Sequence, residues 1–320
     1  MKQRARILIF NDGYDISDLE GIPHRGFEIV SRKEGSREEL LALIGDFDAY
    51  ICTLRIPVDA GILARAPRLR VLGTASTGTD HLDLRLLEQR GIAVLSLKND
   101  LALLERISAT AELGFGLVLA CARHLPICFE ASRDGRWERH NLAGRQLRGQ
   151  VLGLIGLGRL GLMMARYGHA FHMQVIACDP YRKTWPRRVE RVRLKTLLRR
   201  ADFVSLHVHL NSKTRHLLGA KELAMFKPGA ALINTARGGL VDETALIEEM
   251  KAGRIAAAGI DVIDGEWMPD KSKHPLIAYS RENHRLSITP HVGGTCRDAV
   301  VMTARHTFRK VLRHLRRRDP

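Results

Sequence analysis

Short apolar runs alternate with longer amphipathic stretches along nearly the whole chain. A short apolar run is typical of a strand buried on both faces, and apolar residues at every third or fourth position are typical of a helix. The runs predict strands at residues 5–10, 49–52, 71–74, 94–96, 151–155, 174–178, 203–206, 231–234 and 257–260. The amphipathic stretches predict helices at residues 37–43, 84–90, 109–122, 160–170, 194–199, 220–225 and 243–252. This alternation predicts an α/β fold with doubly wound parallel sheets.

Two further segments have unusual patterns. Residues 108–123 are small and apolar almost all round, which predicts a helix buried between two layers and linking two domains. In the tail at 305–318, Arg305, Arg309, Arg313 and Arg316 recur at three- and four-residue spacing, opposite an apolar stripe. The tail therefore predicts an amphipathic terminal helix with a solvated basic face, and polyanion binding is the alternative interpretation.

Composition limits the class of protein. The 320 residues are 45% hydrophobic and 27% charged, which is typical of a globular protein and is enough for two domains. No apolar run approaches the roughly 18 residues that span a bilayer, and the apolar part of the first ten residues is too short for a signal peptide. The five cysteines are scattered, so we expect small buried hydrophobes, no metal site and a reducing, cytoplasmic location.

The net charge of +16 allows an anionic partner. The basic residues are spread along the chain, apart from the segment 187–200 and the tail. No zinc-finger, helix-turn-helix or aromatic RNA-binding pattern accompanies them, so we expect neither nucleic acid nor membrane as a partner.

A glycine-rich motif follows the predicted strand at 151–155. Gly156, Gly158 and Gly161 form GxGxxG, with a helical pattern directly after it. The glycines allow a tight turn, a close approach of backbone N–H groups to a pyrophosphate, and close packing of helix on strand. Asp179 ends the next strand, where a carboxylate would bind the adenosine ribose and repel the 2′-phosphate of NADP. The motif predicts a Rossmann domain that binds NAD; an acidic turn residue is the alternative for Asp179.

Three later segments place polar residues directly after buried strands. They run 233–239, 259–266 and 287–294, and they contain Arg237, Glu266 and His291. Each of these residues alone is commonly structural: an arginine in a glycine turn, a surface glutamate, a histidine after proline. Because the carboxyl ends of parallel strands face the ligand crevice, all three can converge on it.

Together these four segments resemble the D-isomer-specific 2-hydroxyacid dehydrogenase family, from about Val71 to Ala299. The resemblance implies that Arg237 binds the substrate carboxylate and polarises its carbonyl. It implies that His291 moves the hydroxyl proton and that Glu266 orients the imidazole. The expected reaction is hydride transfer between NAD and C2 of a small (R)-2-hydroxy acid or 2-keto acid.

Further residues take expected roles from the same resemblance. The expected cofactor contacts are Thr110, Gly156, Gly158, Arg159, Leu160, Gly161, Asp179, His207, Thr235, Ala236, Asp261, Gly293 and Gly294. The expected substrate contacts are Arg55, Ser76, Thr77 and Gly78.

The chain also departs from the family pattern. Residues 267–273 follow Glu266 where the family has proline at once; Trp267 either walls the pocket or belongs to a tolerated surface insertion. His209 stands where the family usually has proline, which indicates a shifted loop. Only Arg55 stands near the place where phosphoglycerate dehydrogenases carry two arginines, and this disfavours a phosphorylated substrate.

The predicted architecture is a flavodoxin-like substrate domain of residues 1–104 plus 288–320, and an inserted Rossmann domain of residues 105–287. The family resemblance also implies a homodimer built on the helix at 108–123. Two hypotheses for function remain. One is a dehydrogenase that works as a 2-keto acid reductase, and the other is a non-catalytic NAD(H) sensor or corepressor-like protein with the same fold.

Overall fold

The computed structural model describes residues 4–11, 13–137, 139–268 and 270–318. The chain forms two compact units, one of Met1–Ile107 with Thr295–Pro320 and the other of Ser108–Gly294. The unit boundaries lie a few residues from the expected 104 and 288.

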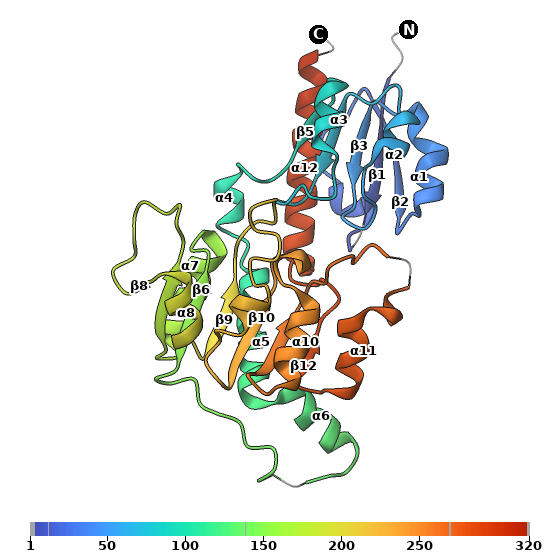
Figure 1. Ribbon diagram of the computed structural model, residues 1–320. Coiled ribbons are helices and arrows are strands. Elements are labelled where there is room, and N and C mark those ends of the chain that lie inside the picture. The colour runs from blue at the N-terminus through green and yellow to red at the C-terminus, as the bar shows by residue number, and fades with distance from the viewer. Residues whose placement is uncertain (1–3, 12, 138, 269, 319–320) are drawn as a thin grey trace. The chain divides into compact units, whose positions relative to one another are not determined.

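The first unit is a five-stranded parallel sheet with helices on both faces (Figure 1). Its strands are β1 (Ala5–Asn11), β2 (Phe27–Lys33), β3 (Ala49–Cys52), β4 (Val71–Thr74) and β5 (Ala93–Leu95), in the order β2-β1-β3-β4-β5. Its helices are η1 (Ile16–Leu19), α1 (Arg37–Leu43), η2 (Ile44–Asp46), α2 (Ala60–Ala64), α3 (Leu84–Gln89), α4 (Leu101–Leu104) and α12 (Arg297–Arg318). This strand order is the flavodoxin-like order that the sequence predicted.

Alternate residues of β1 supply the two cores of this unit. Leu8 and Phe10 pack with α1 and α2 on one face, whereas Ile7 and Ile9 pack with α12 on the other. Because successive side chains of a strand point to opposite faces, a strand buried on both faces is apolar throughout. Helix α12 therefore covers one face of the sheet that contains the N-terminal strands.

The second unit is a seven-stranded parallel sheet, also covered on both faces (Figure 1). Its strands are β6 (Val151–Ile155), β7 (Gln174–Cys178), β8 (Glu190–Arg191), β9 (Phe203–Leu206), β10 (Ala230–Asn234), β11 (Ile255–Ile260) and β12 (Leu286–Ile288), in the order β12-β11-β10-β9-β6-β7-β8. Its helices are α5 (Ala109–Arg123), α6 (Leu125–Arg133), α7 (Arg159–Ala170), α8 (Leu194–Arg200), α9 (Ala220–Leu223), η3 (Gly238–Leu240), α10 (Glu243–Lys251), η4 (Lys271–Lys273) and α11 (Pro275–Glu282). This order is that of a Rossmann fold with one additional strand, so the predicted fold class is confirmed.

Helix α5 packs directly on the second sheet. A Cβ at Gly259 of β11 would lie 2.8 Å from Cβ of Leu117, so the glycine permits this close approach. Burial is not complete around the helix, because Glu112, Gly116 and Arg123 are exposed and form a stripe along one side. The expectation that this helix is buried between two layers is corrected to this extent. No single described helix is long and apolar enough to cross a membrane; the bent pair Leu101–Arg123 and Leu125–Arg133 passes that test together, by length and composition alone.

Two expectations about particular residues are corrected. Cys52 and Cys121 are buried, but Cys128 and Cys178 are half-buried and Cys296 is exposed; all five thiols are free. In α12, Arg309 and Arg313 are exposed as expected, whereas Arg305 donates to the carbonyls of Asp18 and Glu20, and Arg316 to that of Pro23. Part of the basic face is therefore bound to a loop of its own unit.

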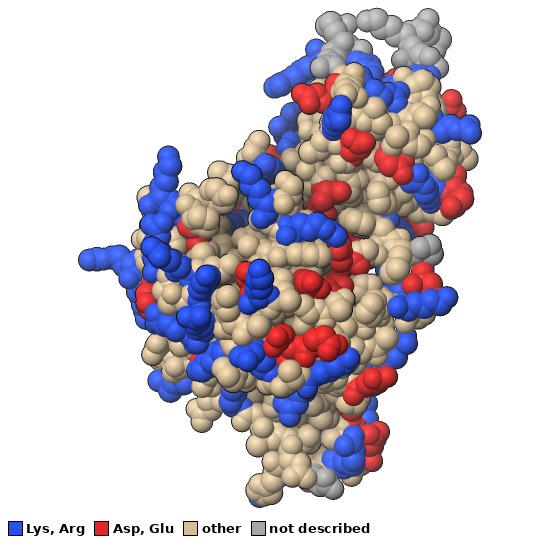
Figure 2. Space-filling view, in the orientation of Figure 1, with Lys and Arg blue, Asp and Glu red and all other residues tan. Residues whose placement is uncertain are grey.

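The remaining basic residues lie mostly at the surface (Figure 2). Lys and Arg are interspersed with Asp and Glu on the face shown, and they gather at the edge that carries β8 and α8. The exposed basic residues of this edge are Lys183, Arg187, Arg188, Arg191, Arg193, Lys195, Arg199 and Arg200.

Candidate active site

The candidate residues of the second unit follow neighbouring strands at their carboxyl ends. The glycine motif follows β6, Asp179 follows β7 and His207 follows β9. Residues 235–237 follow β10, residues 261–266 follow β11, and residues 289–294 follow β12. Since these strands are adjacent and parallel, one edge of the sheet gathers the residues that the sequence singled out.

His291 and Glu266 form a bidentate pair. Nδ1 of His291 lies 3.0 Å from Oε1 and 2.9 Å from Oε2 of Glu266. Two acceptors at Nδ1 place the ring proton there and leave Nε2 for another partner. The hydrogen bond to Glu266 raises the pKa of His291 above its ordinary value, against the lowering effects of burial and of Arg237. The pair therefore favours a protonated imidazole.

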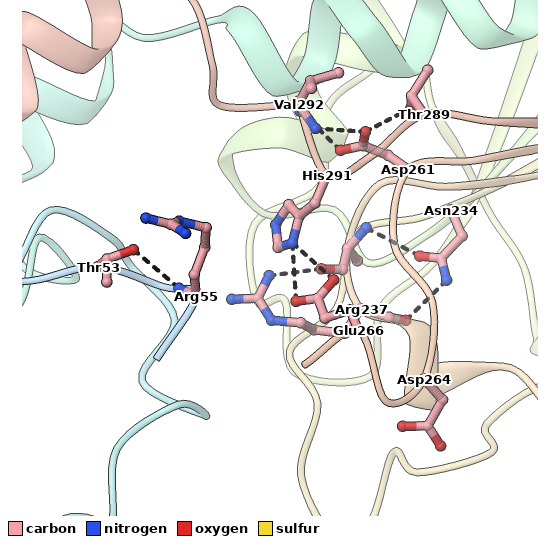
Figure 3. A network of polar contacts seen from close by, with 12 residues as sticks. Thr53, Arg55, Asn234, Arg237, Asp261, Asp264, Glu266, Thr289, His291 and Val292 are labelled. Carbon is pink, nitrogen blue, oxygen red and sulfur yellow. Dashed lines mark hydrogen bonds and ion pairs between the residues drawn. The ribbon is translucent and has the colours of Figure 1, made fainter. Parts of the chain in front are cut away.

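Arg237 lies beside this pair on a loop held by a buried amide (Figure 3). The Asn234 side chain accepts a hydrogen bond from N of Ala236 at 3.0 Å and donates to O of Arg237 at 2.9 Å. The guanidinium of Arg237 itself donates to O of Ala236 at 2.7 Å. The end of β10 thus presents a fixed cation to the His291–Glu266 pair.

Asp261 holds the loop that carries His291. Its buried carboxylate accepts hydrogen bonds from the Thr289 hydroxyl at 2.6 Å, N of Val292 at 2.9 Å and N of Gly293 at 2.8 Å. His291 has a φ of +54°, a left-handed conformation that is costly for a residue with a Cβ. The expected contact of Asp261 with the cofactor stays a prediction. In the structure, the Asp261 carboxylate holds residues 289–293 in place through these hydrogen bonds.

The glycine motif has the geometry that its sequence predicts. Gly156 has a φ of +91°, and a Cβ there would lie 2.5 Å from O of His207. A Cβ at Gly161 would lie 2.3 Å from O of Gly156, whereas Gly158, at the start of α7, has no heavy atom within 4 Å of that position. Two glycines therefore serve the turn, and the third leaves open space at a helix N-terminus.

Asp179 and Arg182 brace this turn. N of Leu157 donates to the Asp179 carboxylate at 2.9 Å, and the Arg182 guanidinium donates to O of Leu157 at 2.6 Å. Asp179 is half-buried, like Arg159 and Leu160 in the motif itself. The carboxylate thus has a structural role in addition to the ribose contact that we expect.

The remaining residues of this edge fit a bound NAD. The Thr235 hydroxyl is buried and has no hydrogen-bond partner among the described residues. Nε2 of His207 and the Ser205 hydroxyl share a hydrogen bond of 2.9 Å. Burial lowers the pKa of His207 to about 4, so the ring is neutral. Gly293 lies against Thr110, whose Cγ2 would be 3.3 Å from a Cβ there. An open glycine at a helix N-terminus and an unpartnered hydroxyl are what a dinucleotide would use.

The candidate substrate residues belong to the first unit. Ser76, Thr77 and Gly78 follow β4, and the Ser76 hydroxyl bonds O of Gly78 at 2.6 Å and the Thr74 hydroxyl at 3.0 Å. Arg55 follows β3, is exposed, and donates its backbone N–H to the Thr53 hydroxyl at 3.1 Å. A hydrogen-bonded loop and an exposed arginine therefore stand at the carboxyl ends of adjacent strands.

Residues after Glu266 form a surface segment. Trp267 is 39% exposed and Met268 is 40% exposed, and η4 follows at Lys271–Lys273. His209, at the position where a shifted loop was expected, is exposed, and its carbonyl accepts a bond from the Thr214 hydroxyl at 2.7 Å.

Sequence reasoning missed several residues that support the site. Asn234 is buried at the end of an otherwise apolar strand, and its polarity there was the available signal. Glu243 and His274 contact the segment that leads to Glu266, but nothing in their local sequence indicates it.

Comparison with known proteins adds an independent observation. The profile of the catalytic domain of D-isomer specific 2-hydroxyacid dehydrogenases matches residues 7–114, and the profile of their NAD-binding domain matches residues 115–293. The chain belongs to the D-isomer specific 2-hydroxyacid dehydrogenase family. The expected family is confirmed, and with it an oxidoreductase whose cofactor is NAD.

Several known proteins are similar over most of the chain. A hydroxypyruvate reductase of Thermotoga maritima is 34% identical over 286 residues, which are 89% of this chain and 90% of that protein. A D-3-phosphoglycerate dehydrogenase of Methanocaldococcus jannaschii is 36% identical over 271 residues, 82% of this chain but 49% of that protein. The crystal structure of TT0316 protein from Thermus thermophilus matches with a TM-score of 0.82 and 34% identity over 94% of each chain. The chain spans about half the length of this phosphoglycerate dehydrogenase.

Proposed function

We propose that this 2-hydroxyacid dehydrogenase reduces a small 2-keto acid to the (R)-2-hydroxy acid and catalyses the reverse oxidation. The observation that carries the proposal is the bidentate contact of Glu266 with Nδ1 of His291, at 2.9 and 3.0 Å, beside Arg237. A general acid, the carboxylate that orients it and a fixed cation are what reduction of a 2-keto acid requires.

Arg237 would bind the carboxylate and the adjacent carbonyl oxygen of the substrate. A guanidinium is always charged and presents its N–H donors in a plane, so it holds a 2-keto acid in one orientation. The side-chain amide of Asn234 bonds N of Ala236 and O of Arg237, and it would hold the backbone of this arginine in place when the substrate binds.

His291 would donate the proton from Nε2 to the carbonyl oxygen and take it back in the oxidative direction. Glu266 keeps the proton on Nδ1 and stabilises the charged imidazolium, so Nε2 can act in both directions. When bound, NADH supplies the hydride to C2 of the acid. The residues proposed to hold this cofactor are 156–161, Asp179, His207, Thr110, Thr235, Ala236, Asp261, Gly293 and Gly294.

Hydroxypyruvate, glyoxylate or a larger 2-keto acid is the proposed substrate. Among these acids we favour hydroxypyruvate, because the chain is similar to the hydroxypyruvate reductase of Thermotoga maritima over 90% of that protein. A phosphorylated acid is disfavoured because the segment after β3 offers one arginine, Arg55, rather than two. The roles of Arg55, Ser76, Thr77 and Gly78 in binding this acid, the homodimer and the cytoplasmic location remain predictions.

Turnover tests the proposal. The purified protein is mixed with NADH and a panel of 2-keto acids, and the loss of absorbance of NADH is followed; a substrate with turnover of about 1–10³ s⁻¹ is expected. Tight NADH binding without turnover of any acid would instead favour the NAD(H) sensor or corepressor-like alternative. A free basic tail would suit that alternative, but Arg305 and Arg316 of the tail bind loop carbonyls.

A further inference from the structure

A second glutamate–histidine pair contacts the segment that leads to Glu266. Glu243 is the first residue of α10, and His274 precedes α11. Oε2 of Glu243 lies 3.2 Å from Nε2 of His274, and the two side chains are only 12% and 5% exposed. The pair is therefore largely withdrawn from water.

Both side chains bond the backbone of one residue, Asp264. Oε1 of Glu243 accepts a hydrogen bond from N of Asp264 at 2.8 Å, and Nε2 of His274 donates to O of Asp264 at 2.9 Å. Nδ1 of His274 accepts from N of Leu276 at 3.3 Å, so the ring proton is on Nε2. The backbone N–H and the backbone carbonyl of Asp264 are thus both held by the same buried pair.

Two further contacts fix the same residue. A Cβ at Gly238 would lie 2.0 Å from C of Ile263 and 2.1 Å from N of Asp264, so the residue after Arg237 lies directly against this peptide. The Asp264 carboxylate pairs with Arg215 at 2.6 Å. Asp264 is therefore the anchored point of the segment, and Figure 3 shows it on the loop that leads to Glu266.

An anchor is needed here because of the residue that follows. Gly265 has a φ of +73°, a region that glycine adopts freely, and the carboxylate of Glu266 comes directly after it. Capping does not explain Glu243, since Asp242 already caps α10 by accepting from N of Ala245 at 3.1 Å. Stability does not explain the pair well either, because a buried ionisable pair adds little compared with apolar residues of the same size.

We propose that Glu243 and His274 are positioning residues, which fix the Asp264 peptide and through it hold the Glu266 carboxylate against Nδ1 of His291. The inference rests on the proposed function of that site. Neither residue contacts the reacting atoms; each acts through the backbone of the segment 264–266.

Replacement of His274 tests this role. His274→Ala removes the donor to Asp264, and we expect kcat for 2-keto acid reduction to fall about 10- to 100-fold, since small misplacements of catalytic groups have effects of this size. His274→Gln keeps an N–H in place of Nε2–H and should recover most of the activity. NADH affinity, measured by fluorescence, should change less than twofold in both variants.

A matched control removes a histidine–glutamate pair elsewhere in the same unit. Nδ1 of His284 lies 3.0 Å from Glu130, and both side chains are about half exposed. His284→Ala should leave kcat within twofold of the wild type. An equal loss in His284→Ala would contradict the proposal, because the effect would not depend on the Asp264 peptide.

The pH profile separates positioning from a general loss of stability. Glu266, Arg237 and Asp261 set the charge around His291. Asp242, Asp264 and His274 lie around Glu243, and Arg215 pairs with Asp264. If Glu266 is misplaced in His274→Ala, the alkaline limb of kcat should move to lower pH, and in His274→Gln it should stay. An unchanged limb in His274→Ala, or an equal shift in both variants, would overturn the proposal.

A measurement without turnover keeps this test independent of the proposed reaction. The imidazole of His291 can be titrated by NMR, with His291→Asn used to assign its signal. In His274→Ala its pKa should fall toward the ordinary value of about 6.5. A wild-type protein that reduces no 2-keto acid would refute the proposed function, whereas an unmoved His291 titration would refute the positioning role.

Discussion

The backbone of His291 constrains which substitution can test its role. Its φ of +54° is tolerated best by asparagine among the residues with a side chain. Asparagine also lacks an acid near neutral pH, so it removes the proton transfer while keeping the loop that Asp261 holds. This combination makes His291→Asn a clean substitution at this position.

We predict that His291→Asn lowers kcat about 10²- to 10⁴-fold, the range typical of general acid–base catalysis. NADH affinity, followed by fluorescence, should be nearly unchanged. His172 is a matched control, because it is exposed, has a φ of +57° and lies outside the site. His172→Asn should leave kcat unchanged, and a His291→Asn enzyme within a few-fold of the wild type would refute the proton-transfer role.

The contact with Glu266 makes a prediction about pH. Because that hydrogen bond raises the pKa of His291, keto acid reduction should persist above the ordinary histidine value of about 6.5 and decline as pH rises through the raised pKa. In Glu266→Gln the decline should begin at lower pH. Steady-state kcat measured against pH in both proteins checks this, and coincident profiles would show that Glu266 does not set the titration.

The same shift has a consequence for stability. A histidine whose folded-state pKa is raised stabilises the folded state fully below its unfolded pKa, and this contribution is lost as pH rises through the folded-state value. The free energy of unfolding of the wild type, measured in denaturant, should therefore gain this contribution toward acidic pH, and His291→Asn should lack it.

At the scale of elements, the turn between β6 and α7 separates two uses of glycine. A Cβ at Gly161 would overlap O of Gly156 at 2.3 Å, whereas a Cβ at Gly158 would meet nothing within 4 Å. Gly158 has a φ of −72°, which other residues adopt freely. Gly161 lets α7 pack closely on the turn at Gly156, and Gly158 leaves room at the N-terminus of α7, where a pyrophosphate would lie.

We predict that Gly161→Ala lowers the free energy of unfolding by about 1–3 kcal/mol or more, as overpacking does. Gly158→Ala should unfold like the wild type but bind NADH more weakly. Denaturant unfolding and NADH fluorescence titration measure the two effects. Equal NADH affinity in Gly158→Ala and the wild type would show that the cofactor does not approach this glycine.

The elements that sequence predicted share a physical cause. Strands such as β3 and β6 are buried on both faces and are apolar throughout, so their bounds were predicted without error. The missed strands β2, β8 and β12 are short or carry polar, partly exposed residues, and all three lie at sheet edges. An edge strand needs no continuous apolar run, so periodicity could not reveal it.

The candidate site divides in a similar way. Arg237, Glu266 and His291 could be predicted because strand ends converge and because their order resembles that of a family. Glu243 and His274 could not, since they bond the backbone of Asp264, which lies 21 and 10 residues away from them along the chain. Contacts to backbone leave no pattern of residue types, and only the structure reveals them.

At the scale of the whole molecule, the first unit is built from two distant segments. Helix α12 returns from residue 297 to cover one face of the sheet, where Phe308, Val311 and Leu312 are buried. A Cβ at Gly73 of β4 would lie 2.8 Å from a methyl carbon of Val311, so helix and strand are in close contact. The core of this unit therefore depends on the C-terminal segment.

We predict that Phe308→Ala lowers the free energy of unfolding by about 3–5 kcal/mol, because it leaves a cavity between α12 and the sheet. The neighbouring Arg309 is exposed, so Arg309→Ala should change it by no more than about 0.5 kcal/mol. Below the unfolding temperature both variants should bind NADH like the wild type, because the glycine motif belongs to the other unit. A Phe308→Ala protein as stable as Arg309→Ala would show that α12 is not an integral part of the first core.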